Sequence, residues 1–260
     1  MIGTILIVSG LGLACGVVLV IASKLMAVPV DTTVETLRAA LPGANCGACG
    51  YAGCDAYAAA LAQGGVKTNL CTPGGDSVSR KLSEILGVAY EDVEEQKAFM
   101  RCNGDFDTSE YIMEYDGPKT CKACNSFYQG RRTCTHGCLG FGDCAEVCKF
   151  NALTIVNGLA VIDRAACTGC GACAKICPNH IIGVASDKAR VHVACSSHDK
   201  GAYTRKVCTA GCIGCMKCQK TCEFDAIKVT DNLAAIDPAK CTNCGKCVEV
   251  CPTKVIKICG

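Results

Sequence analysis

The sequence CTGCGACAKICP at residues 167–178 occurs again, 74 positions later, as CTNCGKCVEVCP at residues 241–252. The correspondence continues upstream, where each copy carries a further pair of cysteines four positions apart. A repeat at a fixed offset indicates a duplicated structural unit. The second half of the chain is therefore expected to contain two copies of one fold, each organised around its cysteines.

The spacing CxxCxxCxxxCP in both copies is that of bacterial ferredoxins, which hold cubane iron–sulfur clusters. Three thiolates on one loop bind a cluster, and the fourth cysteine binds the neighbouring cluster. Soft thiolate ligands suit iron in a tetrahedral sulfur environment. Between the cysteine runs, LTIVNGLAVID (153–163) and IKVTDNLAAID (227–237) each predict a β-hairpin with a tight turn. Short helices and strands together predict an α+β fold.

One position departs from the repeat. Phe141 stands where the second copy has Cys215, so the first copy lacks one thiol. The sequence predicts either that Cys134 replaces it or that the remaining three thiols hold a three-iron cluster, [3Fe-4S]. With Cys134 included, the cross-ligation rule predicts four clusters, held by Cys134, Cys138, Cys144 and Cys177; by Cys148, Cys167, Cys170 and Cys173; by Cys212, Cys215, Cys218 and Cys251; and by Cys222, Cys241, Cys244 and Cys247.

A shorter cysteine motif precedes the repeat. NCGACGYAGC at residues 45–54 contributes Cys46, Cys49 and Cys54, and Cys71 follows a helix expected at 55–62. These four thiols are expected to hold one more four-iron cluster, with glycines that let the backbone approach the sulfur atoms. A zinc site with the same ligands is the alternative. The sequence thus predicts five [4Fe-4S] clusters.

Seven cysteines remain after this assignment. Cys15 and Cys259 are interpreted as small apolar residues. Four of the other five are candidate ligands for a sixth cluster between the two copies. These five are Cys102, Cys121, Cys124, Cys195 and Cys208.

The N-terminal residues 2–22 carry no charged side chain, and they are long enough to cross a hydrocarbon core as one helix. No basic residue precedes them, which argues against a cleaved signal peptide. Lys24 follows the segment. The positive-inside bias therefore predicts a single-pass protein of the inner (cytoplasmic) membrane, with its C-terminal bulk in the cytoplasm.

Composition restricts the function classes. Among 260 residues there are 27 cysteines. Thiols repeated every third residue suit metal clusters better than disulfides. The protein is therefore expected in a reducing compartment. The net charge of +2 leaves out bound thiolates and gives no support for a nucleic-acid partner. Basic side chains after residue 119 are expected to attract an acidic partner such as a small ferredoxin, or merely to offset cluster charge.

The predicted organisation has five parts. They are a transmembrane anchor (1–24), a small helical single-cluster module (25–88), an acidic linker (89–120), and two ferredoxin-like units (121–186 and 187–260).

The apolar N-terminal segment, the NCGACGYAGC motif with Cys71 and the two ferredoxin-type units together resemble the B subunit of the Rnf complex, a membrane-bound ferredoxin:NAD oxidoreductase that pumps sodium ions or protons. The resemblance covers nearly the whole chain and is closest to the longer form found in anaerobic bacteria. It implies an electron-entry subunit that takes electrons from reduced ferredoxin. Its partners would be membrane subunits and subunits that bind flavin and NAD.

The sequence shows no GxGxxG that opens a helix, no P-loop and no flavin-attachment motif. Hydride chemistry is therefore expected on another polypeptide, and this chain is expected to relay electrons without a catalytic residue of its own. Two alternatives remain open. One is a membrane polyferredoxin that reduces a redox-sensing regulator or a nitrogenase, and the other is a structural or sensing protein that its metal sites fold.

Overall fold

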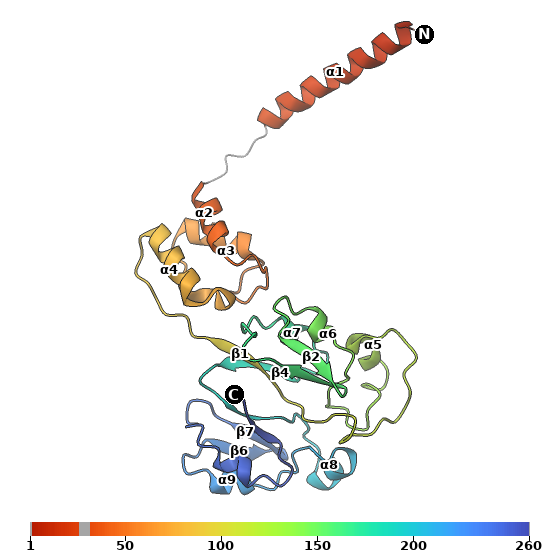
Figure 1. Cartoon of the computed structure of the whole chain (residues 1–260), viewed down its shortest axis with the longest axis vertical. Helices are drawn as coiled ribbons and strands as arrows, with labels where there is room; N and C mark the ends of the chain where they lie inside the picture. Colours follow the sequence, from red (N-terminus) through yellow and green to blue (C-terminus); the bar gives the residue numbers. More distant parts are fainter. Residues whose placement is uncertain (1, 26–31, 260) are drawn as a thin grey trace.

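The structure is a computed structural model that describes residues 2–25 and 32–259. Figure 1 shows a helical module followed by two units that contain short strands. Each unit has two antiparallel sheets of two strands. This mixture of short helices and strands agrees with the α+β expectation.

The N-terminal helix α1 (Ile2–Leu25) corrects one expectation. Among the described residues, no helix combines the length and the apolar character that crossing a membrane requires, so the transmembrane helix predicted at residues 2–22 is wrong.

The NCGACGYAGC motif lies in a module of short helices. Its elements are α2 (Thr32–Ala40), α3 (Cys54–Gln63), η1 (Thr68–Leu70), η2 (Thr72–Gly74) and α4 (Gly75–Leu86). The side chains of Leu37, Leu61 and Leu82 are almost fully buried between these helices. The helix expected at 55–62 is confirmed as α3, and the module presents the cysteine loop from a packed helical core.

The first ferredoxin-like unit combines four strands with three short helices. Its elements are β1 (Gln96–Met100), α5 (Cys121–Asn125), α6 (Asp143–Glu146), β2 (Leu153–Val156), β3 (Leu159–Ile162), α7 (Ala172–Ile176) and β4 (Ile182–Ser186). β2 pairs with β3 across Asn157 and Gly158, whose positive φ angles of 48° and 73° suit a tight hairpin turn. The hairpin predicted here is confirmed. β1 pairs with β4, so part of the stretch 89–120 contributes a strand to this unit.

The second unit repeats this plan. Its elements are β5 (Val191–Val193), α8 (Gly201–Val207), α9 (Lys217–Thr221), β6 (Ile227–Thr230), β7 (Leu233–Ile236), α10 (Lys246–Glu249) and β8 (Ile256–Ile258). β6 and β7 form the second predicted hairpin, and β5 pairs with β8. The two units touch where the ring of Phe99 in β1 stacks on His192 in β5, with ring centroids 4.0 Å apart.

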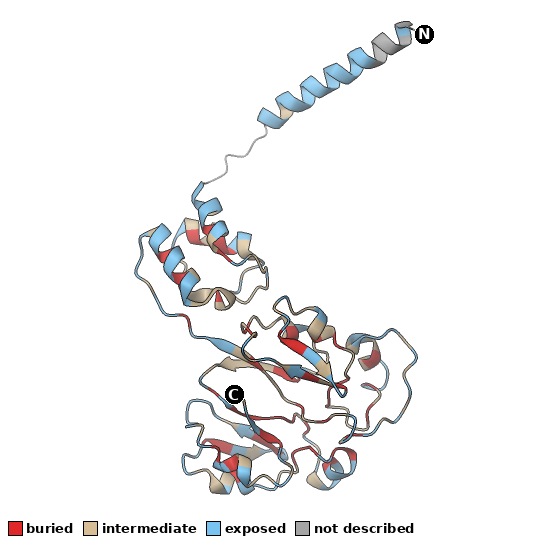
Figure 2. Ribbon diagram, viewed as in Figure 1, coloured by how far each residue is buried: buried red, intermediate tan, exposed pale blue. Residues whose placement is uncertain are grey.

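Cysteines make up much of the core of both units. The buried core residues include Cys138, Cys144, Cys167 and Cys173 in the first unit and Cys212, Cys218 and Cys247 in the second. Figure 2 shows buried residues on the short helices and strands of both units. Both cores combine these cysteines with small and aliphatic side chains.

Candidate iron–sulfur cluster sites

Four cysteines of the helical module lie together and are called the N-terminal set: Cys46, Cys49, Cys54 and Cys71. Burial, and to a smaller extent the charges of the other three thiols, raise the pKa of Cys71 to about 11. The side chain of Asn45 accepts a hydrogen bond of 2.8 Å from the backbone N–H of Cys54, which fixes the loop at the start of α3. The structure thus gathers the four cysteines that the motif singled out.

Three of the four sets expected in the ferredoxin-like units are also gathered. They are set 1b (Cys148, Cys167, Cys170 and Cys173), set 2a (Cys212, Cys215, Cys218 and Cys251) and set 2b (Cys222, Cys241, Cys244 and Cys247). In each set, burial raises the pKa of one cysteine and the charges of the other three thiols add to this effect. Thiols bind metal as thiolates, so metal binding at such a set releases protons.

Backbone N–H groups approach the sulfur atoms of set 1b. The N–H of Ala98 donates to Sγ of Cys167, and that of Ala152 donates to Sγ of Cys148, both at 3.4 Å. Hydrogen bonds of this kind stabilise a thiolate and tune the potential of a cluster that it binds. Strand β1, which carries Ala98, therefore contributes to this site as well as to the sheet.

The fourth set has a different composition from the one expected. Cys138, Cys144 and Cys177 line a small cavity together with Cys121, and Cys134 is not part of it. Burial, and to a smaller extent the charges of the other three thiols, raise the pKa of Cys144 to about 12. The group of Cys121, Cys138, Cys144 and Cys177 is called set 1a.

Asp143 explains how Cys121 reaches set 1a. Its carboxylate accepts hydrogen bonds from the backbone N–H groups of Cys121 at 2.7 Å and Lys122 at 3.1 Å, which holds the first turn of α5 beside α6. Phe141 packs instead against Arg131, whose guanidinium carbon lies 4.3 Å from the ring centroid. The position of the missing thiol is thus used for aromatic packing, and α5 supplies a thiol from another segment.

Cys134 lies in a sixth group with Cys102, Cys195 and Cys208, called the bridging set. These four line one small cavity whose walls come from both ferredoxin-like units. Burial, and to a smaller extent the charges of the other three thiols, raise the pKa of Cys134 to about 12. A Cβ atom added at Gly104 would lie 3.4 Å from Sγ of Cys208 and 3.8 Å from Sγ of Cys102. Glycine at this position therefore leaves the space between these sulfur atoms open.

Six sets of four account for all but three of the 27 cysteines. Those outside the sets are Cys15, Cys124 and Cys259. Of the five candidates for an additional cluster, three lie in the bridging set, Cys121 lies in set 1a and Cys124 lies in neither. Every one of the 27 is a free thiol.

The donor sets have the composition that iron–sulfur clusters require. Within the described residues, no three side chains of His, Cys, Asp or Glu lie close enough together to hold one ion. A zinc ion needs four ligands about 2.0–2.3 Å from its centre. The thiols of set 1a, set 2a and the bridging set each line a small cavity. Four thiolates are the ligands that a [4Fe-4S] cluster requires.

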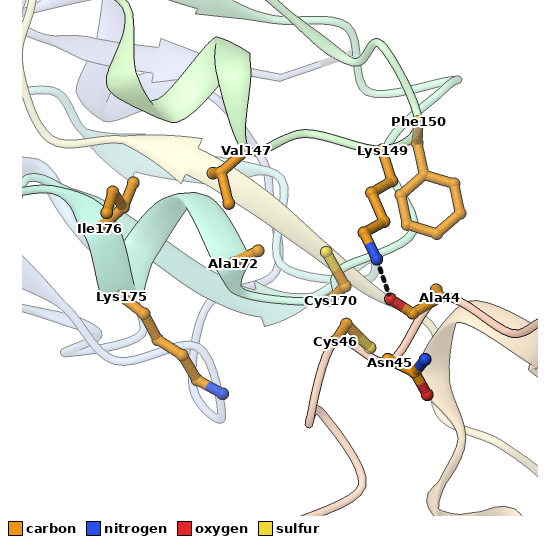
Figure 3. Close-up of a pocket in the computed structure, with 10 residues that line it drawn as sticks. All are labelled: Ala44, Asn45, Cys46, Val147, Lys149, Phe150, Cys170, Ala172, Lys175 and Ile176. Atoms are coloured by element: carbon orange, nitrogen blue, oxygen red, sulfur yellow. Dashed lines mark hydrogen bonds between the residues drawn. The ribbon is translucent and has the colours of Figure 1, made fainter. Parts of the chain in front are cut away.

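The N-terminal set and set 1b meet where the helical module contacts the first ferredoxin-like unit. Cys46 and Cys170 line the same pocket of about 310 Å³, shown in Figure 3. Lys149 reaches across this junction, and its Nζ donates a hydrogen bond of 2.6 Å to the backbone carbonyl of Ala44. The two sets therefore face each other across one contact.

Three protein-family models match parts of the chain. The model described as "Putative Fe-S cluster" matches residues 41–73, "4Fe-4S binding domain" matches residues 160–183, and "4Fe-4S dicluster domain" matches residues 211–255. These ranges contain the N-terminal set, most of set 1b, and sets 2a and 2b. The chain therefore contains [4Fe-4S]-binding domains.

Individual relatives match almost the whole chain. The B subunit of the ion-translocating oxidoreductase complex of Methanosarcina acetivorans is 43% identical over 259 residues, which cover 99% of this chain and 98% of the relative. The B subunit of the proton-translocating ferredoxin:NAD(+) oxidoreductase complex of Clostridium ljungdahlii is 42% identical, over 89% of this chain and 82% of the relative. Its counterpart in the Na(+)-translocating complex of Acetobacterium woodii is 40% identical, over 88% of this chain and 69% of the relative. The resemblance to the Rnf B subunit is confirmed, and the chain belongs to the family of B subunits of the ion-translocating oxidoreductase complexes.

Proposed function

We propose that this chain relays single electrons through six [4Fe-4S] clusters, one on each set, between reduced ferredoxin and partner subunits that carry flavin and the NAD site. The proposal rests above all on one observation, which is that the six sets form a series in which each set lies against the next. The names of the Clostridium ljungdahlii and Acetobacterium woodii relatives supply the donor and acceptor, ferredoxin and NAD(+).

The first half of the series joins the helical module to the first ferredoxin-like unit. Cys46 of the N-terminal set and Cys170 of set 1b line one pocket. The charge of Cys173 in set 1b acts on Cys144 in set 1a, so these two sets are neighbours. Electrons can therefore pass between the helical module and set 1a through set 1b.

The second half of the series runs through the bridging set. The backbone N–H of Cys138 in set 1a donates to Sγ of Cys102 at 3.3 Å, and the N–H of Cys212 in set 2a donates to Sγ of Cys195 at 3.3 Å. Sets 2a and 2b then share the core of the second unit. The bridging set thus lies directly against both ferredoxin-like units.

The protein supplies ligands and environment to this relay. The clusters, when bound, provide one-electron redox chemistry over a wide range of potentials. The cysteines would hold the clusters in order, and the N–H···S hydrogen bonds to set 1b and the bridging set would tune the potentials there. Each transfer moves one electron from a reduced site to an oxidised neighbour, without a proton and without a bond made or broken.

Set 2b forms the end of the series that faces a soluble donor. Its Cys244 is exposed, and the side chain of Lys240 nearby in sequence is exposed as well, whereas Lys246 is paired with Glu223 at 2.6 Å. Positive charge around an exposed ligand favours the approach of a small acidic ferredoxin. We place electron entry at set 2b and exit at the N-terminal set.

Hydride transfer and ion transport then belong to partner subunits. The relatives' names include translocation of protons or of Na(+), and translocation requires a membrane. We therefore propose that this chain works at the membrane through its assembly with those subunits.

The direct test is anaerobic analysis of iron and acid-labile sulfide, followed by titration with reduced ferredoxin while cluster absorbance is recorded. Six clusters correspond to about 24 irons per chain, and ferredoxin is expected to bleach them. Zinc in place of iron, or clusters that ferredoxin does not reduce, would contradict the relay and leave a protein that is merely folded by its metal sites.

The junction between the helical module and the first unit provides a further prediction. Lys149→Met removes the hydrogen bond to Ala44. A hydrogen bond from a charged group at an exposed position contributes about 1 kcal/mol, so we expect the equilibrium constant for forming this contact to fall about fivefold. The rate of electron transfer across the junction should fall by up to the same factor. Stopped-flow reduction of the cluster on the N-terminal set measures this rate. Lys175→Met is the matched control, because Lys175 lines the same pocket without a hydrogen bond across it; an equal effect of both variants would contradict the prediction.

A further inference from the structure

Arg132 is an arginine buried without an anionic partner. Its side chain is 1% exposed and is the largest fully buried side chain among the described residues. Its guanidinium donates to the backbone carbonyls of Gly104 at 2.7 Å and Gly158 at 3.0 Å, and its Nε has no partner. None of the ion pairs found among the described residues includes it. A buried cation of this kind is costly unless an anion lies nearby.

The surroundings of Arg132 are the thiols of the bridging set. A Cβ atom added at Gly104 would lie 3.6 Å from Nη1 of Arg132, between the sulfur atoms of Cys102 and Cys208. A Cβ atom added at Gly137 would lie 3.9 Å from Cδ of Arg132 and 3.7 Å from Sγ of Cys134. The side chain of Arg132 therefore runs beside three of the four thiols.

The other side of the guanidinium is closed by aromatic rings. Its central carbon lies 5.6 Å from the ring centroid of Phe106 and 5.5 Å from that of Tyr111. These rings exclude water, so the charge of Arg132 is weakly screened and acts strongly on whatever the thiols bind. The carbonyl groups and aromatic rings around Arg132 carry only partial negative charge, so they do not replace an anion as its partner.

We propose that Arg132 is the counter-charge of the cluster on the bridging set and raises the reduction potential of that cluster. This inference rests on the proposed function, because it requires a sixth cluster on Cys102, Cys134, Cys195 and Cys208. Four thiolates outweigh the positive charge of the iron–sulfur core, and reduction adds one more negative charge. A fixed cation stabilises the reduced state more than the oxidised state.

The consequence is easier electron transfer between the two ferredoxin-like units. The step concerned moves one electron from a reduced neighbour in set 2a to the bridging set, so that the neighbour is oxidised and the bridging site is reduced, with no proton involved. A higher potential at this site makes the step more favourable. Arg132 therefore affects the transfer through its fixed positive charge and touches no electron donor.

The experiment uses the full chain, purified without oxygen, in four forms: wild type, Arg132→Met, Arg132→Lys and Arg131→Met. Iron is counted, and the potentials are measured by redox titration monitored by electron paramagnetic resonance. We expect Arg132→Met to make reduction of one cluster at least tenfold less favourable, which is a shift of about 59 mV to more negative potential. Arg132→Lys is expected to retain most of the wild-type potential, because it keeps the charge.

Arg131→Met is the matched control. Arg131 is the adjacent arginine, and its guanidinium lies over the rings of Tyr111 and Phe141. Its loss removes the same charge at a neighbouring position and is expected to leave the bridging potential in place. An equal shift in this control would contradict the assignment to Arg132.

The iron count separates the two proposals. About 20 irons in the wild type would contradict the sixth cluster, and with it the six-cluster relay. About 24 irons in the wild type with unchanged potentials in Arg132→Met would contradict the role of Arg132 alone. Loss of about four irons in Arg132→Met but not in Arg132→Lys would support the counter-charge, whereas equal loss in both would show a packing role and contradict it.

Discussion

The paired substitution Cys134→Ala and Cys208→Ala is expected to remove about four irons per chain and to stop electron transfer between the two ferredoxin-like units. Two thiols, those of Cys102 and Cys195, would remain in the bridging set, and a cubane needs four. Among the described residues, the bridging set lies against both set 1a and set 2a through the two 3.3 Å hydrogen bonds to sulfur. The rate of electron tunnelling falls exponentially with distance. Without a cluster on the bridging set, electrons are therefore not expected to pass between the clusters of the two ferredoxin-like units.

The measurement is iron analysis combined with titration by reduced ferredoxin. The variant is expected to retain about 20 irons, of which ferredoxin reduces those in one half of the chain. Cys124→Ala with Cys259→Ala is the matched control, because both cysteines lie outside the six sets, and it should behave as the wild type. Full iron content, or reduction of every cluster at the wild-type rate, would contradict the bridging role.

The sequence predicted the sites whose ligands lie close together in the chain. Set 1b, set 2a, set 2b and the N-terminal set each follow a short spacing motif, because a tight loop delivers three thiols to one point. The hairpins at 153–163 and 227–237 were predictable for a similar reason, since turn residues with positive φ leave a local signal. Local spacing is enough for sites and turns of this kind.

The bridging set could not be derived from spacing, because its four cysteines come from four separate segments. A signal was nevertheless present in the repeat. Cys134 occupies the position equivalent to Cys208, which belonged to the unassigned cysteines. Treating the pair alike would have placed Cys134 with the bridging candidates and left Cys121 for set 1a.

Two further residues left no trace in the motifs. Arg132 is one basic residue among 26 in the sequence, and its burial depends on long-range packing. Asp143 acts on α5 from 22 positions away. At residues 2–22 the sequence led to a wrong prediction, because the uniform lack of charge suggested a transmembrane helix that the described helix does not support.

Cys121→Ala is expected to convert the four-iron cluster of set 1a into a three-iron cluster. Cys138, Cys144 and Cys177 would remain around the same cavity, and a cubane that lacks one protein ligand loses the iron at that corner. We expect about one iron fewer per chain, together with the paramagnetic signal of an oxidised three-iron cluster. Cys124→Ala, a buried cysteine three positions later in α5, is the control and should change neither value.

A second substitution makes this prediction sharper. Phe141→Cys restores the thiol that the second copy carries as Cys215. Added to Cys121→Ala, it is expected to return the missing iron and to remove the three-iron signal, because the loop then supplies the standard ferredoxin ligands. The loss of the contact between Arg131 and Phe141 should lower stability by about 1 kcal/mol without preventing this rescue. If Cys121→Ala alone keeps a four-iron cluster, and Cys134→Ala alone produces the three-iron signal of set 1a, then Cys134 is the ligand and the assignment of Cys121 is wrong.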